Sequence, residues 1–221
     1  MSKKIFFIGF LIFHITIYSQ VYKYNSIENG KNIENRILID DSYFVQTKLE
    51  FPNKKFIMTR GGYYKKSDIG FKVFFEFNSN YKNDSITDLI IDNVNRLSNK
   101  NKVSKKSETI EGKWLMAGRI REGIEKRRDL NRSRKTMKFL IDGFFQWIAF
   151  DTEDFRFFGS GGGSYTSKNN NYIERIDFFS RDNNKVGKVL SFNYTIKGND
   201  WHHKGFSSSG NPLHEIWSYR N

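Results

Sequence analysis

Apolar and polar residues alternate along most of the chain after residue 20, and turn-forming residues separate the alternating runs. A period of two is typical of half-buried β-strands, because their side chains point to opposite faces in turn. In the C-terminal half, the pattern predicts strands at 113–119, 135–142, 144–150, 155–166, 171–180, 187–197, 199–205 and 213–220. Since eight short strands follow one another without a helical pattern, we expect an all-β fold built on an up-and-down antiparallel β-barrel.

The N-terminal half carries a related pattern, with strands predicted at 21–25, 35–39, 43–51, 54–64, 70–78 and 86–97. Residues 36–40 (RILID) resemble residues 138–142 (KFLID), and the same ungapped offset of 102 aligns Gly61 with Gly163. An ancient duplication would explain this repeat, and convergence of two β meanders is the alternative. The first module lacks a counterpart of the final hairpin, Trp201 to Trp217, so we expect a degenerate barrel or a sheet completed by packing on its neighbour.

The first 19 residues predict an export signal. Lys3 and Lys4 precede an apolar run from Ile5 to Tyr18, and the small residue Ser19 precedes Gln20. This order is that of a secretory signal peptide, with cleavage expected between Ser19 and Gln20. The alternative, an uncleaved membrane anchor, needs about 20 apolar residues, and this run is shorter. We therefore expect an exported protein, periplasmic or extracellular, whose mature chain has no transmembrane segment.

A polar, basic stretch divides the rest of the chain. The segment SNKNKVSKKSE, from Ser98 to Glu108, contains no aromatic residue, and such composition is typical of a linker. Val103 leaves room for one short strand inside it. The predicted organisation is a signal peptide at 1–19, a degenerate β module at 20–98, a basic linker at 99–110 and a β-barrel at 111–221.

Two motifs at the ends of the C-terminal module resemble the signature of the calycins, the group that includes the lipocalins. The sequence GKW at 112–114 opens the module, and WSYR at 217–220 closes it. In calycins, a Gly-x-Trp on the first strand packs against an arginine near the end of the last strand. The resemblance therefore implies that Gly112, Trp114 and Arg220 form a structural plug, in which a guanidinium stacks on a flat indole.

A wider likeness covers most of residues 111–221. The segments GKWLMAGR, RKTMKFLIDGFFQWIAFDTEDFRFFGSGGGSYT and HEIWS look like secreted lipocalin-like proteins of Gram-negative bacteria, a group without assigned functions. The resemblance implies a compact lipocalin-like (calycin-type) barrel, shorter than an ordinary lipocalin, preceded here by a related, degenerate β module. It supplies no catalytic residues.

Alternation also divides each strand into two faces, and we expect the more apolar face to line the barrel interior. The rows predicted to point inward are Met137, Phe139 and Ile141; Leu190, Phe192, Tyr194 and Ile196; Tyr172, Glu174, Ile176 and Phe178; and Leu213, Glu215, Trp217 and Tyr219. Trp201 and His203 share one further face. Isolated buried carboxylates are unfavourable, so the two inward acids need partners, and the candidates are Arg119, Arg134 and His203.

The interior has two possible forms. In the first, the barrel holds a polar ligand site formed by Arg134, Trp147, Glu174, Trp201, His203, Glu215 and Trp217. In the second, the charged side chains form an internal salt-bridge network that fills the barrel and leaves no cavity. The second form is plausible because an eight-stranded barrel is only just wide enough for its own side chains.

Composition and charge narrow the chemistry. The chain has no cysteine, which excludes disulfides, cysteine-ligated zinc, iron–sulfur clusters and thiol catalysis. Its formal net charge is +13, and the basic loop at 119–138 (RIREGIEKRRDLNRSRKTMK) contains nine Lys or Arg residues. As a lid over the barrel mouth, this loop would attract anionic ligands or an anionic envelope surface. The alternative is a solvated loop that improves solubility, and export argues against a nucleic-acid partner.

The remaining motifs predict no catalytic residue, metal or cofactor. The glycines at 159–163 lack the ending of a P-loop and predict a bend or bulge in an aromatic strand. His202 and His203 point to opposite faces of one strand, so they cannot easily share a metal ion. An enzyme would need Glu174 or Glu215 as a general base in an open pocket, which leaves a hydrolase as the less favoured alternative.

The function predicted from these patterns is the non-catalytic binding of a small amphipathic or anionic, lipid-like ligand in the barrel of an exported protein. The alternative is a structural or protein-interaction module of the cell envelope, with filled barrels and no ligand. A cavity beside Trp201 or Trp217 would favour the ligand, and a filled interior would favour the interaction module.

Overall fold

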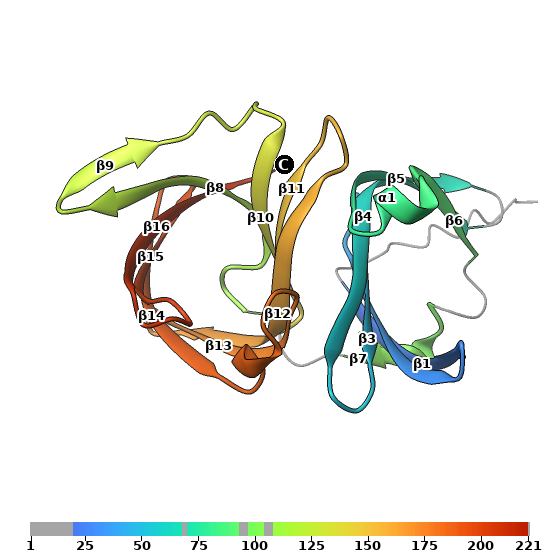
Figure 1. Cartoon of the computed structure of the whole chain (residues 1–221). Helices are drawn as coiled ribbons and strands as arrows, with labels where there is room; N and C mark the ends of the chain where they lie inside the picture. Colours follow the sequence, from blue (N-terminus) through green and yellow to red (C-terminus); the bar gives the residue numbers. More distant parts are fainter. Residues whose placement is uncertain (1–19, 68–69, 93–96, 104–107, 221) are drawn as a thin grey trace, which may run out of the picture.

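The computed structural model describes residues 20–67, 70–92, 97–103 and 108–220. The predicted export signal at 1–19 lies outside the described residues. Within them, the strands form two antiparallel sheets, one from each half of the chain, which lie side by side (Figure 1). Nowhere in these ranges is a helix long and apolar enough to cross a membrane. The fold is all-β, as predicted.

The C-terminal sheet closes into an eight-stranded barrel with one additional strand. Its elements are β8 (Gly112–Arg121), β9 (Ile124–Arg127), β10 (Arg134–Ile141), β11 (Phe144–Asp151), β12 (Phe157–Lys168), β13 (Asn171–Phe179), η2 (Asn183–Lys185), β14 (Val189–Lys197), β15 (Asp200–Phe206) and β16 (Pro212–Tyr219). Strand β8 pairs with β16 on one side and with β10 on the other, so the first barrel strand joins the last. All eight predicted strands have a counterpart, whereas β9, which continues β8 into a hairpin, was not predicted.

The N-terminal sheet is curled but open. Its elements are β1 (Gln20–Glu28), β2 (Lys31–Ile39), β3 (Tyr43–Glu50), β4 (Lys55–Ser67), β5 (Gly70–Asn78), α1 (Tyr81–Asp84), β6 (Asp88–Asp92), η1 (Asn99–Asn101) and β7 (Lys102–Val103). Strands β6 and β7 form its two edges. A short strand occupies the room left at Val103 and pairs with Val21, so the predicted linker contributes a strand to this sheet. A closed barrel beside a half-barrel sheet is compatible with a calycin-like fold.

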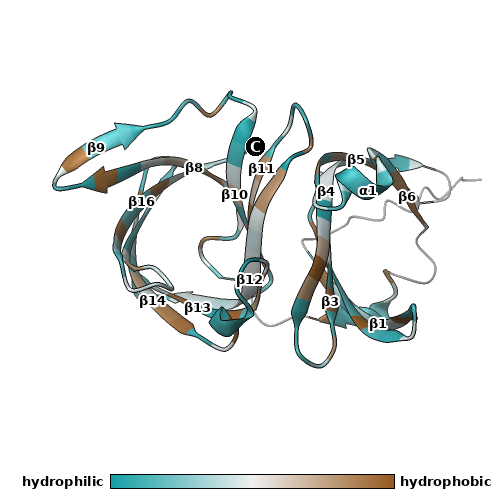
Figure 2. Ribbon diagram, viewed as in Figure 1, coloured by the Kyte–Doolittle hydropathy of each residue, from teal (hydrophilic) through white to brown (hydrophobic). Residues whose placement is uncertain are grey.

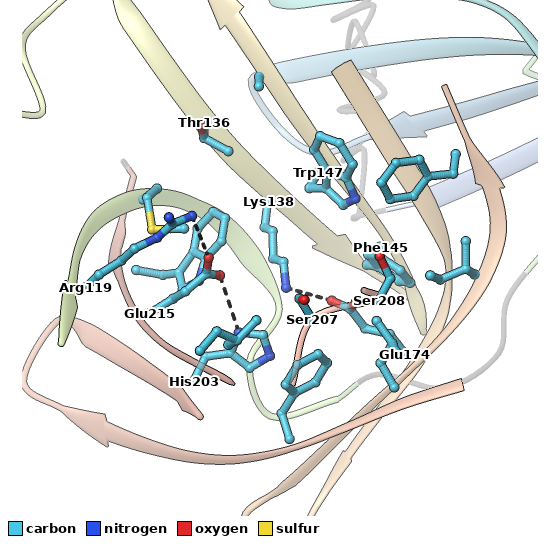
Figure 3. Close-up of a pocket in the computed structure, with 18 of the residues that line it drawn as sticks. Arg119, Thr136, Lys138, Phe145, Trp147, Glu174, His203, Ser207, Ser208 and Glu215 are labelled. Atoms are coloured by element: carbon cyan, nitrogen blue, oxygen red, sulfur yellow. Dashed lines mark hydrogen bonds and ion pairs between the residues drawn. The ribbon is translucent and has the colours of Figure 1, made fainter. Parts of the chain in front are cut away.

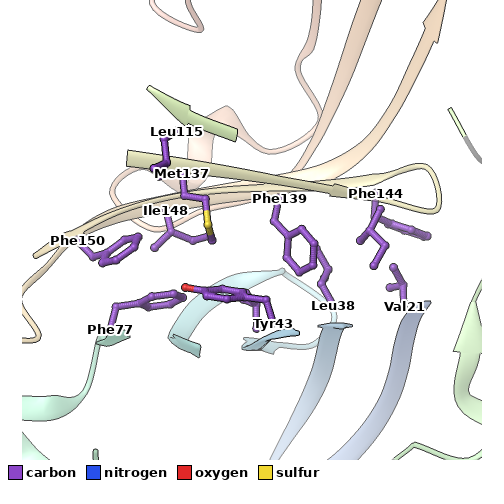
Figure 4. Close-up of a cluster of buried hydrophobic side chains, with 12 residues drawn as sticks. Val21, Leu38, Tyr43, Phe77, Leu115, Met137, Phe139, Phe144, Ile148 and Phe150 are labelled. Carbon is purple, nitrogen blue, oxygen red and sulfur yellow. The ribbon is translucent and has the colours of Figure 1, made fainter. Parts of the chain in front are cut away.

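A shared apolar core joins the two sheets (Figure 4). Its members include Val21, Leu38, Tyr43 and Phe77 from the N-terminal sheet and Met137, Phe139, Phe144, Ile148 and Phe150 from β10 and β11. In Figure 2, β4 and β11 carry hydrophobic stretches where the sheets meet. This arrangement corrects one predicted row, because Met137, Phe139 and Ile141 point out of the barrel into the shared core. The outer face of β10 packs on the second sheet and is the more apolar of its two faces, so apolarity alone does not identify the inner face of this barrel wall.

Buried polar contacts cross the same boundary. The Gln146 side chain donates a hydrogen bond from Nε2 to Thr59 Oγ1 and accepts one at Oε1 from Thr47 Oγ1, both at 3.0 Å. Arg36, which is 1% exposed, pairs with Asp177 at 2.8 Å. Because a buried polar group without its partner is unfavourable, these contacts favour one relative placement of the two sheets.

A β-bulge interrupts the alternation of β13. The register of β12 shifts between Gly162 and Gly163, where the β13 partners change from Phe178 to Ile176. Only glycine is accommodated at position 163, because a Cβ there would lie 1.9 Å from the carbonyl oxygen of Arg175. The glycine-rich run therefore produces the predicted bulge.

The bulge reverses the direction of the side chains that follow it. Phe178 points toward the N-terminal sheet, where its ring stacks on Phe56 with centroids 6.1 Å apart. Phe179 lines the barrel interior together with Glu174 and Ile176. The prediction that Phe178 continues the inward row was therefore wrong, because period-two counting fails across an inserted residue.

The N-terminal sheet contains the same bulge. A Cβ at Gly62 would lie 1.9 Å from the carbonyl oxygen of Phe74, which matches the contact at Gly163. The matching glycines are thus 101 residues apart, one fewer than the offset that aligned Gly61 with Gly163. The turn between β2 and β3 is one residue longer than that between β10 and β11, and this difference changes the offset. The duplication itself stays a prediction.

One end of the barrel is filled by aromatic side chains. Trp114 is 6% exposed, and its Nε1 donates to the carbonyl oxygen of Ile110 at 3.0 Å. Its ring meets Trp201 edge to face with centroids 5.7 Å apart. Gly112 has φ +125°, and a Cβ there would lie 2.5 Å from the Tyr219 ring. Gly112 and Trp114 therefore lie together at a closed end of the barrel.

Arg220 lies on the other face of the barrel wall from Trp114. Tyr219 pairs with Trp114 across the β8–β16 ladder and meets its ring edge to face, so the next residue points outward. The Arg220 guanidinium forms two hydrogen bonds to Glu76 of the N-terminal sheet, at 2.7 and 2.9 Å, and lies 5.5 Å from the Tyr43 ring centroid. The predicted stacking of Arg220 on Trp114 was wrong, and this arginine instead joins the two sheets.

Candidate functional site

The other half of the barrel contains a cavity of about 740 Å³ (Figure 3). The part of β8 that follows Trp114 contributes Met116 and Arg119 to its lining, and the start of β10 contributes Arg134 and Thr136. The cavity therefore opens at the end of the barrel opposite to the aromatic plug. Its lining has three layers, namely a cationic mouth, an apolar wall and a floor of paired charges.

Four arginines form the mouth: Arg128, Arg132, Arg134 and Arg181. None of them forms a salt bridge with a carboxylate in the part of the chain that the structure describes. The Arg134 guanidinium lies 3.0 Å from the Phe158 ring centroid, a cation–π contact that holds it beside the opening. Burial, followed by the positive charges of Arg119 and Arg132, lowers the pKa of Arg128, so the cations at the mouth lie close enough to repel one another.

The wall of the cavity is apolar and aromatic. Its side chains come from the inward faces of β11, β13, β14 and β16 and from the end of β13 after the bulge: Phe145, Trp147, Ile176, Phe179, Leu190, Phe192 and Leu213. The rows predicted for β14 and β16 do point inward at Leu190, Phe192 and Leu213, whereas Ile196 and Tyr219 at the strand ends are about half exposed. Such a wall favours the apolar part of a ligand.

A buried ion pair forms one side of the floor. Lys138 Nζ donates to Glu174 Oε1 at 2.6 Å, and the Tyr172 hydroxyl donates to the same oxygen at 2.8 Å. The ammonium also lies 5.2 Å from the ring centroids of both Trp201 and Trp217. The inward acid Glu174 is thus paired, as buried carboxylates require, but with Lys138 rather than with an expected candidate.

Glu215 forms the other side of the floor. Arg119 Nη2 donates to its Oε1 at 3.1 Å, and His203 Nδ1 lies 3.7 Å from its Oε2, so two predicted candidates are its partners. Burial alone would raise the pKa of Glu215, but the contact with His203 and the charges of Lys138 and Arg119 lower it to about 2. Burial, helped by the charge of Lys138, lowers the pKa of His203 to about 4. At neutral pH, the carboxyl is therefore ionised and the imidazole is neutral.

Six of the seven residues predicted to form the ligand site line the cavity: Arg134, Trp147, Glu174, His203, Glu215 and Trp217. Trp201 lies behind the floor, fully buried, with its ring centroid 5.1 Å from that of His203 and 5.0 Å from that of Tyr172. It therefore supports the floor from below, while the other six side chains reach the cavity from five strands.

Sequence reasoning missed Lys138 and most of the mouth. The alternation of β10 placed Lys138 on the outer face, because its apolar neighbours Met137 and Phe139 were taken as the inner row. The other missed residues are Arg128, Arg132 and Arg181. The first two belong to the basic loop, whose predicted position over the barrel mouth was the available signal, whereas no pattern distinguished Arg181.

The three histidines of the last hairpin lie on both faces of the sheet. His202 and His203 point to opposite faces of β15, as expected, and His202 Nδ1 lies 3.4 Å from His214 Nε2 outside the cavity. Within the described ranges, no three His, Asp or Glu side chains are grouped in a way that could hold a metal ion.

No protein-family model matches the chain, and a search of the curated proteins found no match. The interpretation of the cavity therefore depends on its own geometry and charge.

Proposed function

We propose that this protein is an exported, non-catalytic binding protein whose barrel takes a small amphipathic anion. The observation that carries the proposal is the contrast between the mouth and the wall of the cavity. Four arginines without carboxylate partners among the described residues surround the opening, and an apolar wall follows directly below them. An anionic head group would neutralise the mouth while an apolar body covers the wall.

The dimensions and energies suit such a ligand. Small-molecule sites have volumes of roughly 300–1,000 Å³, and the cavity of about 740 Å³ lies within this range. Each methylene group removed from water contributes ~0.8 kcal/mol, so eight of them contribute about 6 kcal/mol. Hydrogen bonds from an arginine to a charged group add ~1.5–3 kcal/mol each. After the loss of translational and rotational freedom, we expect dissociation constants on the order of micromolar.

The rest of the proposal draws on the sequence. Export rests on the leader pattern of residues 1–19, and the finer relationship to lipocalin-like calycins rests on the GKW motif that opens β8.

The hydrolase alternative would use Glu174 or Glu215, and both carboxylates are held by cations at the floor. The lowered pKa of Glu215 makes it a weaker proton acceptor, which supports binding over catalysis at this residue.

A second candidate is a protein-interaction module of the cell envelope. Its support is the β8–β9 hairpin, which projects from the barrel (Figure 1). Ile124 near its tip is 62% exposed and lies between the cationic side chains of Arg121 and Lys126. An exposed apolar residue among cations suits an anionic protein surface, and this function would leave the cavity without a ligand.

Intrinsic fluorescence provides the test, because Trp147 and Trp217 line the cavity. The purified protein is titrated with dodecanoate, dodecyl phosphate and dodecanol at low and high salt. We expect saturable quenching by both anions and at least about tenfold weaker binding of the uncharged alcohol, since one charge-assisted contact contributes ~1.5–3 kcal/mol. The advantage of the anions should shrink as salt is added.

Two variants test whether the anion is held by the arginines of the mouth or only by the overall positive charge of the protein. In the double variant Arg132→Gln/Arg134→Gln, the anions should lose their advantage over dodecanol. Arg175→Gln is the matched control, because Arg175 is exposed on the outer face of β13 between two inward residues, and it should bind as the unaltered protein does. A flat fluorescence response to all three ligands, or equal binding of the anions and the alcohol, would refute the proposal.

A further inference from the structure

The floor of the cavity contains polar atoms that the protein itself leaves without partners. In the described residues, His203 Nε2 and the indole Nε1 of Trp217 are buried and form no hydrogen bond, whereas His203 Nδ1 faces Glu215 Oε2 at 3.7 Å. His203 is 1% exposed and Trp217 is 2% exposed, and both line the cavity. Since nearly all buried polar side-chain atoms in proteins have a partner, these two side chains indicate a polar group that occupies the floor.

The two side chains are neighbours on the inward face of the last hairpin. Trp217 pairs with Trp201 across the β15–β16 ladder, and Glu215 pairs with His203, so Trp217 and His203 are diagonal neighbours on one face. Figure 3 shows His203 beside Glu215, with Lys138 above both side chains. Both side chains therefore lie on the same part of the cavity floor.

The hydrogen-bonding capacity of the two side chains is complementary. The Trp217 indole can only donate. The His203 imidazole is neutral at pH 7 and offers one donor and one acceptor. Glu215 Oε2 lies 3.7 Å from Nδ1, which favours the tautomer with its proton on Nδ1 and leaves Nε2 as the acceptor. A group that both accepts from the indole and donates to the imidazole is a hydroxyl.

The charges of the floor argue against an ion at this position. Lys138 is balanced by Glu174, and Arg119 is balanced by Glu215, so the four charges sum to zero. Burying a further charge there would be unfavourable, whereas an uncharged hydroxyl would not. The uncompensated positive charge lies at the other end of the cavity, at the arginine mouth.

We propose that the ligand has two polar ends, an anionic head at the arginine mouth and a hydroxyl group at the far end of its apolar body, which binds Trp217 Nε1 and His203 on the floor. This inference rests on the function proposed above and specifies the chemical class of the ligand. The class is that of ω-hydroxylated carboxylates or phosphates with an apolar spacer.

Pairs of ligands with equal numbers of non-hydrogen atoms provide the test. Calorimetric titration of the purified protein compares ω-hydroxy carboxylates of 8, 10, 12 and 14 carbons with methyl-terminated carboxylates that are one carbon longer. We expect one chain length at which the hydroxyl improves affinity at least about tenfold, because it makes two hydrogen bonds that the methyl group cannot make. An ω-methoxy ligand of the same length, which accepts but does not donate, should lose most of that gain.

Variants of the floor residues test whether they cause the gain in affinity that the hydroxyl group brings. In Trp217→Phe or His203→Phe, the ratio of the two affinities should fall to about one or below, since the hydroxyl loses a partner. Tyr165→Phe is the matched control, because the Tyr165 hydroxyl is also buried without a partner among the described residues but does not line the cavity, and it should keep the ratio of the unaltered protein. The methoxy comparison needs no variant, so it decides the question even where a substitution prevents folding.

The outcomes separate the two proposals. If the methyl-terminated carboxylates bind and the hydroxyl brings no gain at any length, the two-ended ligand is refuted and the binding function stands. If none of the carboxylates binds, the proposed function fails, and the inference fails with it. A gain that persists unchanged in both Trp217→Phe and His203→Phe would also refute the assignment to the floor.

Discussion

Replacing Glu174 by glutamine would remove the negative partner of Lys138 while keeping the shape of the side chain. The ion pair is buried on both sides, with side-chain exposures of 6% and 7%, and its atoms are 2.6 Å apart. Removing one partner of a buried ion pair costs about 3–5 kcal/mol, because the remaining charge stays out of water. The glutamine oxygen can still accept from Lys138 and from Tyr172, and the surrounding rings still attract the ammonium. We therefore expect a loss near the lower limit, about 3 kcal/mol.

A double-mutant cycle isolates the pair. Lys138→Met should cost a similar amount, since it leaves the Glu174 carboxylate buried with Tyr172 as its remaining partner. The double variant Lys138→Met/Glu174→Gln removes both charges, and buried ion pairs replaced by uncharged groups of similar volume are often nearly neutral in stability. We expect it to lose about 1 kcal/mol or less, which gives a coupling energy of several kcal/mol.

Urea unfolding at pH 7 provides the measurement, followed by tryptophan fluorescence and by far-ultraviolet circular dichroism. The two signals report the barrel and the whole chain, because all four tryptophans lie in the barrel, so coincident transitions are required before free energies are compared. A loss below about 1 kcal/mol for Glu174→Gln would refute the reasoning, since a value that small is typical of ion pairs exposed to water. Additive single and double variants would refute the coupling between the two residues.

Three further changes follow from the same structure. Gly163→Ala should destabilise by about 2 kcal/mol or more, because its Cβ would lie 1.9 Å from the Arg175 carbonyl oxygen, and the midpoint of urea unfolding measures the loss. Arg220→Met should cost about 2 kcal/mol by removing the paired hydrogen bonds to Glu76 between the sheets, and the same unfolding curve reports it. Stability should fall as pH decreases from 6.5 to about 4, because the unfolded chain takes up a proton on His203 that the folded chain does not, and unfolding at several pH values gives the slope.

Controls make each of these results decisive. Ser164→Ala, next to the bulge, should change stability by less than about 0.5 kcal/mol, and an equal loss at both positions would contradict the steric argument. Arg175→Met on the outer face should be neutral, in contrast to Arg220→Met. In His203→Phe, the decline in stability between pH 6.5 and 4 should become shallower, and an unchanged slope would show that His203 does not cause it.

Most of the strands could be predicted from the sequence. The eight strands of the barrel and the six of the N-terminal half appear close to their expected positions, as does the short strand at Val103. Alternation and turn chemistry are local properties, so they are visible in the chain before it folds. The inward acids Glu174 and Glu215 were also visible in this way, because each interrupts an otherwise apolar row.

The contents of the candidate site were only partly predictable. His203 and Trp217 line the cavity as the alternation of their strands suggested, and the site candidate Trp147 lines it too, whereas Lys138 was placed on the wrong face. The β10 strand is apolar on the side that meets the N-terminal sheet, and the alternation alone cannot tell that contact from a barrel interior. The bulge after Ile176 added a second error of the same kind at Phe178.

The sequence by itself determined that the chain is all-β, where most of its strands and turns lie and that a barrel closes between its first and last C-terminal strands. Only the tertiary structure decided which face of β10 is the inner one, that Arg220 binds Glu76 instead of stacking on Trp114, and that four arginines gather at one opening. The physical reason is that strand formation follows from neighbouring residues, whereas these choices depend on how two sheets far apart in the sequence bury their surfaces against each other.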